Sequence, residues 1–182
     1  GLFYSGMALM AILTVYGKKQ GLLSDEVFNE NHLHDIGKLM FAFTVFWAYI
    51  FFSQFMLQWY ANIPEEISYY IRRKENGWFT VSRLVFGFHF ILPFFLLLPR
   101  AVKRSYKLLP KIAGLMLVAQ WFDCYYLIMP VFDKVPAFGW VEVGMALGFL
   151  GIFGLTVSRS LEKVSAIAYK APRMDQCLAH SQ

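Results

Sequence analysis

Residues 38–61 read KLMFAFTVFWAYIFFSQFMLQWYA, an apolar stretch whose single charged side chain, Lys38, stands at its start. A bilayer core about 30 Å thick is crossed by roughly 20 apolar residues in an α-helix. This stretch is long enough, and it contains no proline or glycine that would interrupt a helix. We therefore predict that residues 38–61 form a transmembrane helix.

Apolar stretches elsewhere in the chain predict a multi-pass protein. Residues 81–99, 112–131 and 138–158 approach the same length, and the shorter stretch 2–16 is also apolar. The 182-residue chain is 58% hydrophobic and 16% charged, with a mean hydropathy of +0.47, whereas soluble domains carry about 25% charged residues. We predict an all-α bundle of about five membrane helices in residues 1–170, followed by a tail, residues 171–182. Because the chain opens inside an apolar stretch, we expect it to be the C-terminal part of a longer membrane protein.

The basic residues predict the orientation. A net charge of +5 and a pI of 9.2 would suit a nucleic-acid partner, but the basic residues lie in short runs between apolar stretches, as in membrane loops. If the spans alternate, twelve Lys and Arg fall on the side of residues 18–38, 100–111 and 159–173, and five on the other. The positive-inside rule places the first side and the C-terminus in the cytoplasm. Trp59, Trp78 and Trp140 near the opposite ends predict an aromatic belt.

The predicted outward segment, residues 62–73, reads NIPEEISYYIRR and predicts an interfacial helix. Asn62 is expected to cap this helix and Pro64 to occupy its first turn, while Glu65 and Glu66 meet the positive end of the helix dipole. A connector that lies on the membrane and a surface for a substrate or partner both fit this pattern.

Metal and disulfide chemistry find little support. His32, His34 and Asp35 lie close together in the sequence, but their spacing lacks a fourth ligand, so we predict no metal site. The two cysteines, Cys124 and Cys177, form no recognisable framework.

Asp123 lies in QWFDCYY, residues 120–126, slightly past the expected midplane. An ionisable group at this depth costs about 2.5–3.5 kcal/mol on insertion scales, so it calls for a partner or a function. Gln120, three residues earlier, shares its helix face. Two hypotheses stay open: a proton relay or quinone-contacting carboxylate, and a neutral carboxyl that holds helices together.

His89 is another ionisable residue inside a predicted span. Pro93, four residues later, leaves the His89 carbonyl without its helical donor, so we expect the helix to bend there. A proton-relay site and a hydrogen bond to a neighbouring helix both fit. Haem is not predicted, because a site between two histidines needs a second intramembrane histidine.

Three further polar residues fall from the midplane outward. Gln54 and Gln58 are spaced i, i+4, and Glu142 lies near the outer start of the last span. With Asp123 and His89 they would form a polar half-channel if their faces converge; otherwise the glutamines hold helices together and Glu142 meets the helix dipole. The last span also carries a small-residue stripe that predicts a close-packing face, formed by Gly144, Gly148, Gly151 and Gly154.

Residues 34–66, HDIGKLMFAFTVFWAYIFFSQFMLQWYANIPEE, closely resemble the C-terminal half of the second large membrane subunit of bacterial alternative complex III. That complex is a quinol:cytochrome c oxidoreductase, and its large membrane subunits are related to the polysulfide reductase membrane subunit (NrfD-like). FFSQFMLQWYANIPEE is the most specific part. The segments that follow are similar in order: an Arg-containing loop, a span with Phe, His and Pro, an Asp-bearing span that ends in LIMP, and a Gly-rich span.

The resemblance implies a ten-helix subunit of two four-helix bundles plus extra helices, of which this chain supplies the second bundle. It implies as partners an NrfD-like sister membrane subunit, an iron–sulfur subunit, pentahaem and monohaem cytochrome c subunits, and a terminal oxidase. The c-type haems and iron–sulfur clusters would lie in those partners, with no cofactor in this chain. The quinol, menaquinol or another, would be oxidised at the sister subunit, in a bacterial inner membrane.

We therefore predict a non-catalytic subunit that anchors the complex and conducts protons. Asp123 and His89 are its main relay candidates, with Gln54, Gln58 and Glu142 as further ones. A purely structural anchor is the second hypothesis. Half of a secondary transporter is the third, for which a broken helix at Pro93 and a midplane carboxylate would be typical.

Overall fold

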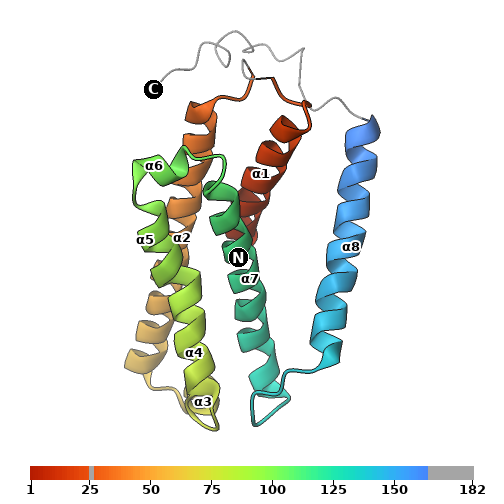
Figure 1. Ribbon diagram of the computed structural model, residues 1–182. Helices are drawn as coiled ribbons and strands as arrows, with labels where there is room; N and C mark the ends of the chain where they lie inside the picture. Colours follow the sequence, from red (N-terminus) through yellow and green to blue (C-terminus); the bar gives the residue numbers. More distant parts are fainter. Residues whose placement is uncertain (25–26, 164–182) are drawn as a thin grey trace.

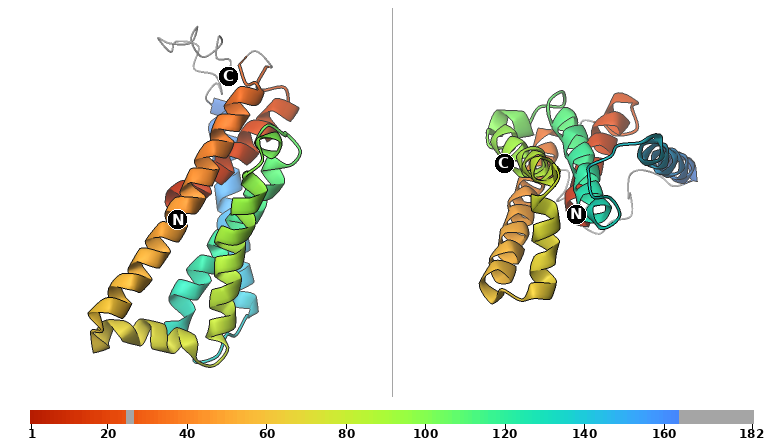
Figure 2. Two further views of the ribbon diagram at one scale, coloured as in Figure 1. Left: turned by 90° about the vertical axis from the view of Figure 1, so that its left-hand side faces the viewer. Right: turned by 90° about the horizontal axis from the view of Figure 1, so that it is seen from below.

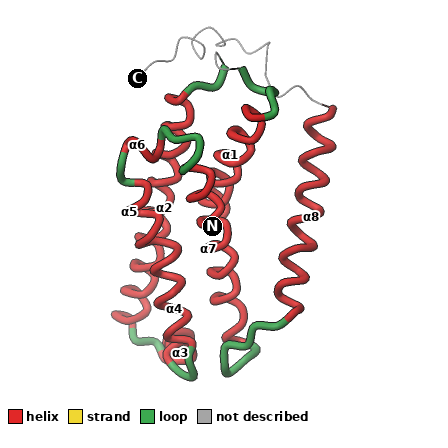
Figure 3. Tube along the Cα trace, in the orientation of Figure 1, coloured by secondary structure: helices red, strands yellow, loops and turns green. Residues whose placement is uncertain are grey.

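The computed structural model describes residues 1–24 and 27–163, and these residues form helices joined by short connections (Figures 1 and 3). The predicted tail, residues 171–182, lies outside them, as does Cys177. The elements are α1 (Leu2–Lys19), α2 (Glu30–Ala61), α3 (Pro64–Lys74), α4 (Trp78–Phe86), the π-helical η1 (Gly87–Ile91), α5 (Leu92–Leu97), α6 (Arg100–Lys103), α7 (Leu109–Ile128), the 3-10 turn η2 (Met129–Val131) and α8 (Trp140–Lys163). The prediction of an all-α protein is confirmed.

Four helical stretches of the described chain are long and apolar enough to cross a membrane: Glu30–Ala61, Trp78–Leu97, Leu109–Val131 and Trp140–Lys163. Four of the predicted spans are thus confirmed as helices of membrane length. The fifth, at residues 2–16, is not confirmed. α1 is a helix of 18 residues, but Lys18 and Lys19 occupy its last turn, so its apolar part is too short.

The helices run alternately between two ends of the molecule (Figure 1). One end holds the last turn of α1, the start of α2, α6 and the last turn of α8, and the other holds α3 and the loop between η2 and α8. This arrangement agrees with the alternation that the charge count assumed. The cytoplasmic assignment of the basic end stays a prediction.

α1 lies against both α2 and α7, and this contact forms most of the hydrophobic core (Figure 2). The buried hydrophobic residues of α1 are Tyr4, Ala8, Ala11 and Val15, which recur every three or four positions on one helix face. In α7, the fully buried Ala113 belongs to the same core. Small side chains let helix backbones approach closely, which is how membrane helices gain packing energy.

Two local predictions are wrong. Asn62 does not cap α3; it ends α2 in the left-handed conformation (φ 50°, ψ 36°), which asparagine tolerates better than most residues, and Ile63 precedes the first turn of α3. Trp78 does not belong to an aromatic belt, because it is 1% exposed and its indole N–H donates to the carbonyl of Asp133. Trp59 and Trp140 are exposed, as that prediction required.

α8 stands apart from the bundle, and none of its residues is buried (Figure 1). A Cβ atom added at any of Gly144, Gly148, Gly151 or Gly154 would meet nothing within 4 Å. The predicted close-packing face therefore has no partner within the described part of the chain.

Candidate functional site

The site begins with an irregularity in the third span. Pro93 carries no N–H, so a regular helix cannot satisfy the carbonyl of His89. The backbone instead forms the π-helical segment η1, in which the N–H of Leu92 donates to the carbonyl of Gly87. The free carbonyl of His89 accepts a hydrogen bond of 3.1 Å from the hydroxyl of Tyr4 on α1. The hydroxyl of Tyr4 on α1 thus replaces the helical N–H donor that Pro93 lacks.

The imidazole of His89 is fully buried between two aromatic rings. Its ring centroid lies 4.0 Å from that of Trp47, at an interplanar angle of 14°, and 4.3 Å from that of Tyr4, at 28°. The backbone of Ala119 on α7 lies close enough to bond weakly to the ring, and no side chain of the described residues bonds to either ring nitrogen. His89 therefore has both ring faces covered, and its ring nitrogens have no side-chain partner.

Asp123 reaches the same indole from the opposite helix. Its side chain is 6% exposed, and its Oδ2 accepts hydrogen bonds from Trp47 Nε1 at 3.2 Å and from Gln120 Nε2 at 3.5 Å. The prediction that Gln120 shares the face of Asp123 is confirmed. An indole N–H can donate but cannot accept, so Trp47 orients the carboxylate and does not itself relay a proton.

Together Tyr4, Trp47, His89, Gln120 and Asp123 form a buried polar cluster. It draws on α1, α2, η1 and α7, so four separate segments of the chain must pack correctly to form it. Asp123 makes no ion pair with a basic side chain of the described residues. Two ionisable side chains therefore contact one indole, and no basic side chain of the described residues pairs with Asp123.

The other three predicted site residues lie elsewhere. Gln54 is exposed, and Gln58 is half-buried with an Oε1 that accepts no hydrogen bond. Glu142 accepts a hydrogen bond of 2.9 Å from the backbone N–H of Gly139 at the start of α8, outside the bundle. This contact favours the helix-end role for Glu142 over the half-channel.

Tyr4 and Trp47 were missed by sequence reasoning. Each carries one polar atom on a large apolar ring, and such atoms find a partner when the side chain is buried. That signal is present in the sequence, but it is shared by Tyr49 and Trp59, which are exposed. Only the packing of the helices determines that Tyr4 and Trp47 lie inside the bundle and that Tyr49 and Trp59 do not.

Arg73 forms a second buried polar feature, also unforeseen. It is 3% exposed, and its guanidinium donates to the carbonyls of Tyr69 at 3.0 Å and Leu127 at 2.7 Å, while lying 3.5 Å above the centroid of the Tyr69 ring. These contacts fasten α3 to the end of α7. The helix predicted to lie at the membrane surface is therefore attached to the bundle.

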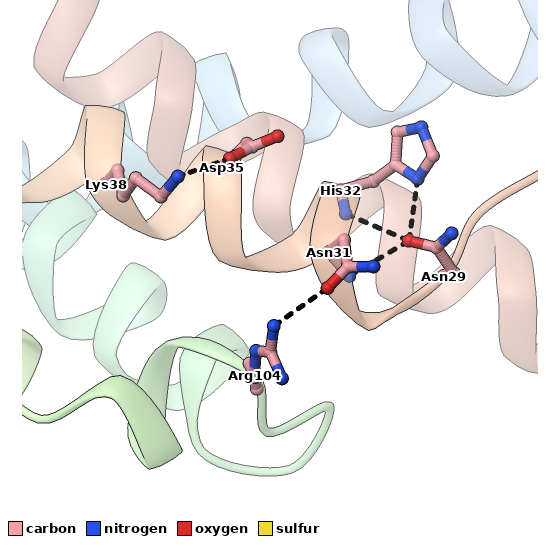
Figure 4. Close-up of polar contacts among 6 residues, drawn as sticks. All are labelled: Asn29, Asn31, His32, Asp35, Lys38 and Arg104. Atoms are coloured by element: carbon pink, nitrogen blue, oxygen red, sulfur yellow. Dashed lines mark hydrogen bonds and ion pairs between the residues drawn. The ribbon is translucent and has the colours of Figure 1, made fainter. Parts of the chain in front are cut away.

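Two of the three residues considered for metal binding, His32 and Asp35, have other partners (Figure 4), whereas His34 is buried and its Nδ1 makes no hydrogen bond. At the start of α2, the side chain of Asn29 accepts hydrogen bonds from the backbone N–H groups of Asn31 and His32, and it lies 2.9 Å from His32 Nδ1. Asp35 forms an ion pair with Lys38 at 2.9 Å. In residues 1–24 and 27–163 no three His, Cys, Asp or Glu side chains gather in a way that could hold a metal ion.

Comparison of the sequence with protein-family models and with curated proteins found no match. The four apolar helices indicate a multi-pass membrane protein. The buried polar cluster formed by α1, α2, η1 and α7 is the candidate site.

Proposed function

We propose that this chain is an integral membrane subunit of a bacterial respiratory quinol:cytochrome c oxidoreductase of the alternative complex III type, in which the buried polar cluster moves protons. The observation that carries the proposal is the contact of Asp123 and His89 with the same indole, Trp47, inside the bundle. The resemblance of residues 34–66 supports the kind of complex, and the cluster supports the proton chemistry.

The cluster has the properties that proton transfer needs. Ionisable residues inside membrane spans are costly, and proton relays are a common reason for their presence. The ring nitrogens of His89 have no side-chain partner in the described residues, and the side chains bonded to Asp123 are the neutral donors Trp47 and Gln120. Each can therefore gain or lose a proton without breaking an ion pair. Stacking and hydrogen bonds from Trp47 and Tyr4 keep both groups in place during the exchange.

In this proposal the subunit carries no redox centre. Electrons pass from quinol, menaquinol or another, through the iron–sulfur and cytochrome c subunits, and the sister membrane subunit holds the quinol. This chain forms the second four-helix bundle of an NrfD-like subunit, with its basic end in the cytoplasm. The unpartnered stripe of α8 offers a face for one of these subunits.

Purification from native membranes tests this assignment. The full-length protein, isolated in mild detergent, is examined by a reduced-minus-oxidised optical spectrum and by mass spectrometry of its subunits. We expect c-type haem bands and a co-purifying iron–sulfur subunit. A colourless preparation without partner subunits would overturn the proposal.

A purely structural anchor is the second candidate, and one contact favours it. The bond from Trp47 to Asp123 joins α2 to α7, and hydrogen bonds of this kind hold membrane helices together. This candidate predicts that Asp123→Asn leaves proton movement unchanged. The transporter hypothesis has less support, because α4, η1 and α5 run on as one helical stretch instead of two separate half-helices.

A further inference from the structure

An open cavity of about 580 Å³ lies between α2 and α4, beside α3. Figure 2 shows α2 and α4 diverging toward this end of the molecule, where α3 crosses from one to the other. The volume is within the range of about 300–1,000 Å³ that small-molecule sites occupy. The cavity lies away from the opposite, lysine-rich end of the bundle, and the proposed proton chemistry does not use it.

The wall of the cavity has two chemically different parts. Arg73, Lys74 and Arg83 line it at the α3 end, whereas Phe51, Phe86 and Ile91 line it along the membrane-spanning helices. No acidic side chain lines it. Such a surface fits an amphiphile with a negative charge at one end and an apolar body at the other.

The charge of Arg73 is the feature that calls for a ligand. This side chain is only 3% exposed, its two terminal nitrogens bond to neutral carbonyls, and its Nε has no hydrogen-bond partner. No carboxylate of the described chain forms an ion pair with Arg73, Lys74 or Arg83. Burial of an unpaired charge costs free energy, and an anion in the cavity would reduce that cost.

Tyr70 also lines the cavity, and its side chain carries no negative charge that would repel an anion. Burial raises the pKa of its phenol to about 12, and the neighbouring Tyr69 adds to the effect. The hydroxyl is therefore neutral at physiological pH. The lining then carries only positive charge.

We propose that this cavity binds an anionic glycerophospholipid. Its phosphodiester lies against Arg73, Lys74 and Arg83, and part of its acyl chains lies along Phe51 and Phe86. The bilayer supplies such a molecule directly, because α2 and α4 belong to membrane-spanning stretches. A small soluble anion would leave the aromatic part of the wall without a contact. Clustered Lys and Arg at a membrane surface are the usual partners of anionic lipids.

Native mass spectrometry of the intact protein in detergent tests the proposal. The protein is titrated with phosphatidylglycerol, with zwitterionic phosphatidylcholine and with inorganic phosphate, and the bound fraction is measured for each. The variant is the double substitution Lys74→Gln and Arg83→Gln, since neither side chain makes a hydrogen bond that the fold needs within the described chain. Arg72→Gln is the control: it removes a charge from α3, the helix that carries Lys74, and Arg72 does not line the cavity.

We expect phosphatidylglycerol to bind wild-type protein at least tenfold more tightly than phosphatidylcholine. The double variant should bind it about 25-fold more weakly, since each basic side chain near a membrane surface contributes about fivefold. Arg72→Gln should bind it within about twofold of wild type. Equal affinity of wild-type protein for the two lipids would overturn the proposal, and so would an unchanged affinity in the double variant. Tight binding of inorganic phosphate that displaces phosphatidylglycerol would assign the site to a free anion and also overturn it.

Discussion

α7 and α8 are consecutive membrane-length helices of 23 residues, counted through η2, and 24 residues, and they have similar hydropathy. Their surroundings differ completely. In α7, 33% of the most apolar stretch is buried, and in α8 none is. α7 also carries Gln120 and Asp123 in mid-span, whereas the acidic residues of α8, Glu142 and Glu162, lie in its first and last turns. Apolar length thus predicts that a helix crosses the membrane, and polar residues in mid-span indicate which helix packs into the bundle.

Small residues show the same difference. Ala113 and Ala119 of α7 are buried against the rest of the bundle, while Gly148 of α8 has open space around its Cα atom. A small side chain permits close packing but does not create a partner. The stripe of α8 therefore gains its packing energy only when another helix lies against it.

The largest expected effect comes from placing a large side chain at Ala113 of α7, compared with the same change at Gly148 of α8. Ala113→Leu overpacks the contact of α7 with α1 and should lower the free energy of unfolding by about 1–3 kcal/mol. Gly148→Leu in α8 should cause no loss, because a Cβ atom there meets nothing within 4 Å and leucine favours a helix more than glycine does. Unfolding in mixed dodecyl maltoside and SDS micelles, followed by circular dichroism, measures both. Equal losses in the two variants would show that α8 is packed as α7 is.

A smaller effect is expected from the hydrogen bond that ties α7 to α2. Trp47→Phe removes the indole donor to Asp123 and part of the ring that stacks on His89, and it should cost about 1–2 kcal/mol. Trp59→Phe is the matched control on the same helix, because Trp59 is 65% exposed. The control should stay within about 0.5 kcal/mol of wild type in the same unfolding experiment. If both variants lose the same amount, the buried polar cluster contributes nothing of its own.

The smallest effect concerns the bond from α1 to the π-helical segment. Tyr4→Phe keeps the ring stacked on His89 and removes only the hydroxyl that donates to the His89 carbonyl. Interhelical bonds of this kind average about 0.6 kcal/mol. Amide exchange of the backbone around residues 87–91 should accelerate in the variant. An unchanged exchange rate would mean that the π-helical segment does not depend on Tyr4.

The sequence predicted the parts of this structure that local chemistry determines. Four membrane-length helices follow from the length of their apolar stretches, and the pairing of Gln120 with Asp123 follows from helical spacing. Asn62 was misplaced because asparagine suits both a helix start and a left-handed helix end, so the residue type alone does not decide between them.

The rest depended on tertiary packing. Trp78 was expected in an aromatic belt at the membrane surface, but its position at the end of a span does not show whether the side chain faces inward. Arg73 was expected on an exposed connector, and its burial requires that α7 end beside α3. The cluster itself joins Tyr4 to His89, 85 positions apart, and Trp47 to Asp123, 76 apart. No spacing rule relates residues at such distances.

The central claim is that Asp123 exchanges protons, and Asp123→Asn tests it most directly. Asparagine has nearly the same shape and can still accept from Trp47, but it cannot be protonated and deprotonated. Glu142→Gln is the matched control, since it makes the same chemical change outside the bundle. The complex is reconstituted in liposomes, and protons moved per quinol oxidised are recorded with a pH-sensitive dye. We expect Asp123→Asn to lower this ratio while subunit composition stays intact, and Glu142→Gln to keep the wild-type ratio. A wild-type ratio in the assembled Asp123→Asn complex would contradict the account.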